Sequence, residues 1–316
     1  MSTLRYPPAG EFVPADIVSQ NLNRLDLDFS GSLNARRAHL RELALSIADA
    51  CEDVDELLEV LVGFGTGVPF TPQTIGENMS FLRVGFAQLS LLERTELCRM
   101  LCAMPSLSLK TSDFFPPDEP IALIARNTIA YLQNNFADRA FHAFTQVMPR
   151  ARAQYHDTYQ SVCEAVASGN CEACILPIEH AQDGKLISFY RLIDRYDLKI
   201  VCSCALAQNN GPESRFALLK KNISFARPTQ THLRYFELSI TQNGDETIGA
   251  LLTAAQLYGL CLRRIDAIPL EYADEGFAFH IMLSFEKDIQ LLPFLLYLTL
   301  ELPQYNAVGI FAHIAE

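Results

Sequence analysis

The last third of the chain has the most regular pattern of apolar and polar positions. Residues alternate between the two kinds over Phe236–Thr241 and again over Phe277–Glu286, which predicts two strands. A helix is predicted between them, because Asp245 can cap it, Gly259 can end it, and apolar residues recur at helical spacing from Ile248. The other predicted elements are a strand over Leu260–Leu270, a helix over Pro293–Leu302 with Pro293 in its first turn, and a strand over Val308–Ile314. The order βαββαβ over residues 233–316 is the ferredoxin-like pattern.

Residues 121–228 alternate short apolar strands with helices. Asp157 can cap one helix and Gly169 can end it. The predicted strands are Ile129–Leu132, Ala173–Pro177 and Lys199–Leu206, and the other helices are Asp138–Met148 and Leu186–Asp194. This alternation predicts an α/β layer with mostly parallel strands.

Residues 1–105 have helical periodicity. Helices are predicted over Asn34–Cys51, Val54–Val62, Thr74–Leu91 and Leu92–Met104. We expect Gly63–Gly67 to interrupt this region as a helix–helix turn, since it lacks the Gly-Lys-Ser/Thr ending of a phosphate-binding loop. The proline-rich residues 106–120 predict a linker to the next domain.

Composition and charge narrow the possible partners. The chain has 316 residues, of which 49% are hydrophobic, enough for two or three cores. A net charge of −12 argues against nucleic-acid binding. With no apolar run of about 18 residues and no signal peptide, we expect a cytoplasmic protein that does not enter a membrane. The nine cysteines are then expected to be free thiols.

Several motifs of residues 121–316 occur in the order found in one enzyme family. They are Ile129–Leu132, the run Tyr159–Glu179 with its Leu176-Pro177-Ile178-Glu179 ending, Leu198–Val201 and Ser214-Arg215-Phe216. In this order they resemble the prephenate dehydratases, which form phenylpyruvate from prephenate. The resemblance implies a periplasmic-binding-protein-like α/β domain followed by an ACT domain. It also implies that Ser214 and Arg215 would carry catalysis, with Ser214 as the general acid.

Three departures from the family pattern bear on that activity. Gln133–Ala137 replaces a glycine-rich substrate loop, and His180-Ala181 replaces an Asn-Ser pair. Only Ala207–Pro212 separates the strand ending near Leu206 from the Ser214 motif, where the family has an entire second lobe. We therefore expect a shortened, catalytically degenerate domain, with an active prephenate dehydratase as the alternative.

The βαββαβ unit resembles the phenylalanine-sensing ACT domains of the same family. Gly249, Ala250 and Leu251 match their Gly-Ala-Leu segment, and Asp266 stands where their Glu-Ser-Arg-Pro motif begins. The resemblance implies that these residues bind an amino acid or a prephenate-like ligand, and His180 is a further candidate for ligand binding. Homo-oligomers would form through the ACT domains. Without this ligand role, Gly249 and Ala250 would serve close helix–sheet packing.

Other patterns suggest chemistry less strongly. Cys171 and Cys174 form a CxxC pair, and Cys202 and Cys204 a CxC pair, but they lack zinc-finger spacing and are interpreted as buried thiols. Residues 1–105 could be a chorismate mutase, as in bifunctional relatives, or a helical interaction module. The arginines available for a mutase pocket are Arg36, Arg37, Arg41, Arg83 and Arg94, and the lack of lysine in the first 109 residues favours the interaction module. No cofactor or metal is expected.

Overall fold

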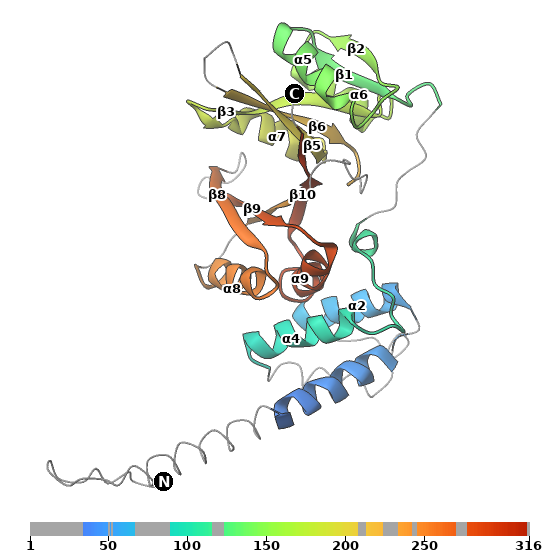
Figure 1. Ribbon diagram of the computed structural model, residues 1–316, viewed down its shortest axis with the longest axis vertical. Helices are drawn as coiled ribbons and strands as arrows, with labels where there is room; N and C mark the ends of the chain where they lie inside the picture. The colour runs from blue at the N-terminus through green and yellow to red at the C-terminus, as the bar shows by residue number, and fades with distance from the viewer. Residues whose placement is uncertain are drawn as a thin grey trace, which may run out of the picture.

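The computed structural model describes residues 34–49, 51, 53–66, 89–115, 123–207, 213–223, 233–241, 245–269 and 277–314. Figure 1 shows an α/β part at one end of the long axis, a βαββαβ part in the middle and a group of helices at the other end. The C-terminus lies in the α/β part (Figure 1). The three parts follow the order of the three regions predicted from the sequence.

The helical part contains a helix over residues 34–49, α2 (Val54–Thr66), α4 (Leu91–Cys102) and the 3-10 helix η1 (Thr111–Phe114). Ser90 and Glu93 form a reciprocal capping box at the start of α4. The predicted break at Gly63 is wrong, because α2 continues to Thr66. A glycine inside a helix costs only about 1 kcal/mol, which the buried Leu57 and Leu61 side chains of α2 outweigh. The helix predicted over Thr74–Leu91 falls almost entirely outside the described residues.

The α/β part has helices on both faces of a mixed sheet. Its elements are β1 (Thr128–Leu132), α5 (Asn135–Phe144), β2 (Arg152–His156), α6 (Tyr159–Ala167), β3 (Ala173–His180), β4 (Gly184–Lys185), α7 (Ile187–Arg195), β5 (Lys199–Ala207) and β6 (Glu213–Lys220). The strand order is β2-β1-β3-β6-β5, in which β1 pairs in parallel with β2 and β3, and β6 is antiparallel to β3 and β5. The exposed edge strand β2 was not predicted, because it has little apolar pattern.

Local signals explain several helix ends in this part. Thr158, and not the predicted Asp157, caps α6, since its hydroxyl accepts a hydrogen bond from the Ser161 N–H. Gly169 follows α6 with a φ of +74°, a left-handed conformation that suits glycine.

Residues 208–212 alone connect β5 to β6, and Ala207 lies opposite Glu213 in the antiparallel pair. The two strands therefore form a hairpin.

The βαββαβ part confirms the predicted order of elements. It contains β7 (Arg234–Thr241), α8 (Asp245–Leu257), β8 (Cys261–Pro269), β9 (Phe277–Phe285), α9 (Asp288–Glu301) and β10 (Asn306–Phe311). The strand order β10-β7-β9-β8 and the antiparallel pairings are those of a ferredoxin-like sheet. The predicted start of α9 is wrong, because Pro293 is inside the helix and Gln290 caps its start by accepting from the Glu286 and Lys287 N–H groups.

The two sheets are continuous through β10. This strand pairs in parallel with β5 at Gly309 and Ile200, and the short β11 (His313–Ile314) continues the pairing along β5. A Cβ atom at Gly309 would lie 2.3 Å from the Ile200 carbonyl oxygen. The close approach of the strands therefore requires glycine at this position.

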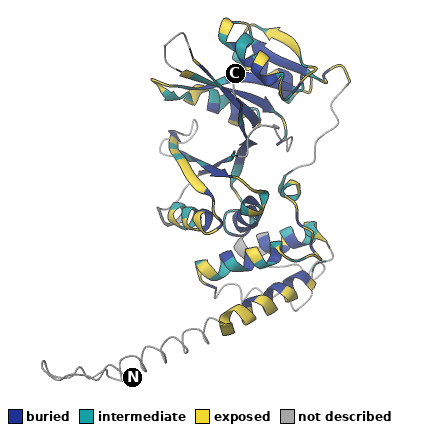
Figure 2. Cartoon of the chain, in the orientation of Figure 1, coloured by how far each residue is buried: buried dark blue, intermediate teal, exposed yellow. Residues whose placement is uncertain are grey.

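Three apolar cores hold the parts together, and Figure 2 shows the buried residues along the strands and in α9. One core joins α2 and α4 to α8, α9 and one face of β7, β9 and β10, through residues such as Leu57, Leu97, Phe236 and Phe294. The second lies under α6 and α7 and includes Phe311 of β10, and the third lies under α5. The helical part thus covers α9 rather than standing apart. No helix in the described part of the chain is long and apolar enough to span a membrane.

Candidate functional site

The polar face of the βαββαβ sheet is buried against the α/β part. Glu237 alternates with Phe236 and Leu238 as the sequence indicates, yet its side chain is only 2% exposed. His280 on the neighbouring strand β9 is 7% exposed. Because alternate residues of a strand face opposite sides, Glu237 lies on the face away from α8 and α9. A carboxylate buried in this way needs partners.

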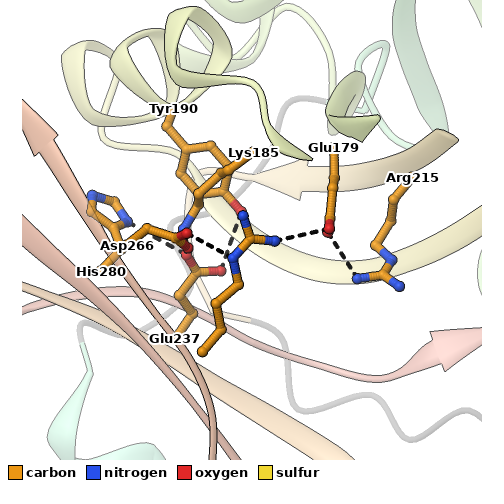
Figure 3. A network of polar contacts seen from close by, with 8 residues as sticks. Glu179, Lys185, Tyr190, Arg215, Glu237, Asp266 and His280 are labelled. Carbon is orange, nitrogen blue, oxygen red and sulfur yellow. Dashed lines mark hydrogen bonds and ion pairs between the residues drawn. The ribbon is translucent and has the colours of Figure 1, made fainter. Parts of the chain in front are cut away.

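Glu237 finds those partners on both parts of the molecule (Figure 3). Lys185 of β4 lies 2.5 Å from its carboxylate, the Tyr190 hydroxyl of α7 lies 3.3 Å from it, and Nδ1 of His280 lies 3.4 Å from it. Burial alone would raise the pKa of Glu237, but the charge of Lys185 and the hydrogen bond with His280 outweigh burial and lower that pKa to about 2. Glu237 is therefore ionised at neutral pH.

A second carboxylate, Glu179 at the end of β3, bridges two guanidinium groups (Figure 3). Arg215 Nη1 donates to one oxygen of Glu179 at 3.0 Å, and Arg264 Nη1 donates to the other at 2.8 Å. Arg264 also donates through Nε to Asp266 at 2.7 Å, and Asp266 lies 3.3 Å from Lys185. The ion pairs thus form one network, with three cationic and three anionic side chains.

Strand irregularities accompany the network. The pairing of β3 with β6 shifts register between Pro177 and Glu179, so that Glu179 lies directly opposite Arg215. The pairing of β8 with β9 shifts in the same way just before Arg264. Such bulges redirect side chains and are common beside functional sites. Here the two register shifts lie beside Glu179 and Arg264, whose side chains meet between the two parts of the molecule.

The network encloses a pocket with room for about one water molecule. Ile178, Met282, Phe311 and His313 complete its lining. His313 contacts the Ser203 hydroxyl through Nδ1, and burial, reinforced by the charge of Arg215, lowers the pKa of His313 to about 4. A substrate larger than water can enter only if side chains of the network move.

The comparisons with known proteins concern the fold. No protein-family model and no curated protein matches the sequence. Among solved structures, the prephenate dehydratase from Streptococcus mutans is 18% identical, with a TM-score of 0.51 over 59% of this chain and 98% of that chain. A structure described as GqqA, a novel type of quorum quenching acylase, is 18% identical (TM-score 0.45, 59% of this chain and 95% of that chain). The prephenate dehydratase from Arthrobacter aurescens in complex with L-Phe is 13% identical (TM-score 0.46, 58% and 90%).

Over this part of the chain, the fold is similar to that of prephenate dehydratase. The predicted resemblance is confirmed at the level of the fold. At 18% identity the likeness says nothing more about activity.

The structure separates the two residues predicted to carry catalysis. Ser214 and Arg215 are neighbours on β6, so their side chains point to opposite faces of the sheet. Arg215 lines the pocket on the α7 side, whereas Phe216, on the same face as Ser214, belongs to the core under α5. Ser214 lies opposite His180 in the register of β3 and β6. His180 Nδ1 lies 3.2 Å from the Asp183 carboxylate.

The predicted ligand-binding residues are also divided between two faces. Asp266 belongs to the buried network, whereas Leu251 lies in the core on the opposite face of the βαββαβ sheet. Gly249 is in the second turn of α8, and a Cβ atom there would meet nothing within 4 Å, so Gly249 is not required for close packing. Of the predicted site residues, the structure brings only Arg215 and Asp266 into one network.

The segment where the resemblance implies a glycine-rich loop forms the start of α5. Asn134 caps α5, and its side-chain oxygen accepts from the N–H groups of Phe136 and Ala137 at 3.1 and 2.9 Å. Phe136 stacks on Phe216, with ring centroids 6.4 Å apart. These two backbone donors at the start of α5 are therefore already occupied and are not available to an anion.

The other chemical candidates lie apart from the network. Cys171, Cys174, Cys202 and Cys204 are buried, and no group of three or more potential ligands for a metal occurs among the described residues. Arg36, Arg37 and Arg41 are exposed, whereas Arg94 makes an ion pair with Glu301, and Arg83 lies outside the described residues.

Sequence reasoning missed Lys185, Tyr190, Glu237, Arg264 and His280 as parts of one network. One signal was present, since Glu237 and His280 are ionisable residues at the polar positions of two alternating strands. The partners on β4 and α7 could not be found in this way, because nothing in the local pattern places them against β7 and β9.

Proposed function

We propose that this protein is a catalytically inactive member of the prephenate dehydratase fold group, serving as an assembly and amino-acid-sensing module linked to aromatic amino acid metabolism. The observation that carries the proposal is the β5–β6 hairpin, whose five-residue connection at 208–212 leaves no chain for a second lobe. Loss of carbon dioxide and hydroxide from prephenate requires a general acid near the leaving hydroxyl. It also requires groups that hold the two carboxylates of prephenate in place. Ser214 and Arg215 face opposite sides of the sheet, and Arg215 already pairs with Glu179.

Assembly is supported by the open edge of the βαββαβ sheet. Strand β8 pairs with β9 on one side and with no other strand among the described residues. Leu262 and Ile265 on β8 are 40% and 39% exposed. An exposed apolar edge favours pairing with a second copy of the chain. The βαββαβ unit would then act as an ACT-like domain that forms a homodimer through β8.

The assembly proposal is tested by analytical ultracentrifugation of the full chain. We expect a dimer, and we expect Ile265→Lys to shift it to a monomer without loss of folding. Leu92→Lys is the matched control, because Leu92 is 61% exposed on α4, in the helical part of the molecule. A monomeric wild-type protein, or dissociation by both variants alike, would contradict pairing through β8.

The sensing proposal rests on the Gly249, Ala250 and Leu251 segment and on its resemblance to phenylalanine-sensing domains. Calorimetric titration with L-phenylalanine, other amino acids and prephenate provides the test. We expect an amino acid to bind the full chain. If none of these compounds binds at millimolar concentration, the sensing role is wrong and assembly alone remains.

The enzymatic alternative is an active prephenate dehydratase that uses Ser214 and Arg215. One observation favours it: both side chains retain the hydroxyl and guanidinium groups of the motif and are partly exposed. Phenylpyruvate formation that disappears in Ser214→Ala would establish this alternative. Formation that persists in Ser214→Ala would instead assign the activity to other residues.

A further inference from the structure

Arg215 and Arg264 form a pair of guanidinium groups held by a single carboxylate, that of Glu179. Arg215 comes from β6 of the α/β part and Arg264 from β8 of the βαββαβ part. Each donates one Nη1 hydrogen bond to a separate oxygen of Glu179. The three side chains are 27–29% exposed, so a small solute can reach them from solvent.

The hydrogen bonding of Arg215 is incomplete. Its Nε atom is buried and has no hydrogen-bond partner among the described residues. A carboxylate frequently accepts two parallel hydrogen bonds from one guanidinium group. Glu179 supplies only one oxygen to Arg215, because its other oxygen is bound to Arg264. Arg215 therefore keeps hydrogen-bond donors that Glu179 does not use.

We infer that Arg215 and Arg264 form a binding site for the carboxylate of a small ligand, and that Glu179 occupies this site when the ligand is absent. This inference rests on the proposed sensing role, but it places the ligand between the two parts of the molecule and not at Gly249, Ala250 and Leu251. The incoming carboxylate takes the place of the Glu179 carboxylate, so the small volume of the pocket does not exclude it. The displaced Glu179 side chain turns toward solvent, where its charge is hydrated.

The neighbouring charges explain why the ligand is an anion. Arg264 keeps its Nε bond to Asp266, and Lys185 keeps its contacts with Glu237 and Asp266. Once Glu179 leaves, Arg215 and the Nη1 donor of Arg264 lose their acceptor. A neutral ligand leaves this positive charge uncompensated, whereas a carboxylate restores the balance.

The site lies between two parts of the molecule, so binding of a ligand there would affect how the two parts are held together. Glu179 already links β6 to β8 through its two oxygens. A ligand that replaces it must make the same link or release it. Binding at this site can thereby influence the β8 edge through which we propose that the protein assembles.

Calorimetric titration of the full chain with sodium succinate, at constant ionic strength, tests the inference, with succinamide as the neutral control. We expect succinate to bind and succinamide not to bind. We expect Glu179→Ala to bind succinate about tenfold more tightly, because the competing internal carboxylate is gone. Glu179→Gln, which preserves the shape of the side chain, is expected to bind more tightly than wild type by a smaller factor and replaces Glu179→Ala if that variant does not fold.

The matched control uses two adjacent arginines of β8. We expect Arg264→Gln to weaken succinate binding at least about tenfold, since it removes one of the two guanidinium groups. Arg263→Gln should bind as wild type does, because Arg263 donates to Ser284 and does not contact Glu179. Unchanged affinity in Arg264→Gln, or affinity in the Glu179 variants no tighter than that of wild type, overturns the inference. Either result would not bear on the proposed absence of dehydratase activity, because that activity is measured separately with prephenate.

Discussion

The two faces of the βαββαβ sheet are both covered along β7 and β9, one by apolar side chains and the other by charged ones. One face presents Phe236 and Leu238 to α8 and α9, which are themselves covered by α2 and α4. The other presents Glu237, Arg264 and His280 to the α/β part, where Lys185 and Tyr190 meet them. Alternation in the sequence identifies which residues share a face. It does not show whether a polar face meets water or a second set of charges.

The largest effect is expected on the apolar face. Phe236→Ala removes a fully buried ring that packs edge-on against Phe294, with ring centroids 6.3 Å apart. We expect a loss of about 4 kcal/mol in the free energy of unfolding. Because no charged group is removed, this loss should be the same, within measurement error, between roughly pH 3 and 8. Urea unfolding followed by circular dichroism measures it. A strong pH dependence of this loss would show that the two faces are coupled.

The second test removes the buried carboxylate of the polar face. We expect Glu237→Ala to lower the free energy of unfolding by about 3 kcal/mol at neutral pH, because Lys185 would be buried without its closest acceptor. The pKa of Glu237 in the folded protein, about 2, is below its ordinary value. Its stabilising contribution is therefore fully present above roughly pH 5 and is lost as the pH falls toward 2. Urea unfolding at several pH values should show the difference between wild type and Glu237→Ala shrinking over this range. A constant difference would contradict the role given to the ion pair with Lys185.

The junction between the two sheets provides the third test. Gly309→Ala places a Cβ atom 2.3 Å from the Ile200 carbonyl oxygen, so we expect it to separate β10 from β5 at a cost of about 2 kcal/mol. Gly249→Ala is the matched control, since nothing lies near its Cβ position and helix propensity predicts a gain of about 0.5–1 kcal/mol. Unfolding curves of both variants make the comparison. Equal stabilities for the two variants would mean that the strands do not approach as closely as described.

The smallest effect is expected where the helical part meets α9. Arg94 Nη1 contacts both carboxylate oxygens of Glu301, at 2.8 and 2.9 Å, and the pair is partly exposed. We expect Arg94→Ala to cost about 1 kcal/mol, and a double-mutant cycle with Glu301→Ala to show a coupling of similar size. Additive losses in the cycle would show that the pair contributes nothing beyond its separate side chains.

Much of the fold could be predicted, because its signals are local. The alternation around Phe236 and over Phe277–Glu286, and the left-handed glycine Gly259 after α8, are among the signals that predicted the βαββαβ order. The start of α9 was misplaced because Pro293 suggested a first turn, whereas the cap provided by Gln290 lies three residues earlier. The edge strand β2 has no buried face from which a pattern could arise.

The site was less predictable, because it depends on contacts between distant segments. The motif analysis found Arg215 and Asp266 separately, one through each resemblance, but gave no reason to place them together. The link between them is Arg264 with Glu179, residues 85 positions apart in the chain. Their contact follows from the continuity of the two sheets through Gly309 and Ile200, which no local pattern reveals.

The most direct measurement of the central claim is phenylpyruvate formation from prephenate by the purified full chain. A hairpin in place of a second lobe, with Ser214 and Arg215 on opposite faces of β6, predicts no formation above the uncatalysed rate in wild type or in Ser214→Ala. Phenylpyruvate formation by the wild-type protein above the uncatalysed rate would contradict the account, and its loss in Ser214→Ala would assign the activity to Ser214.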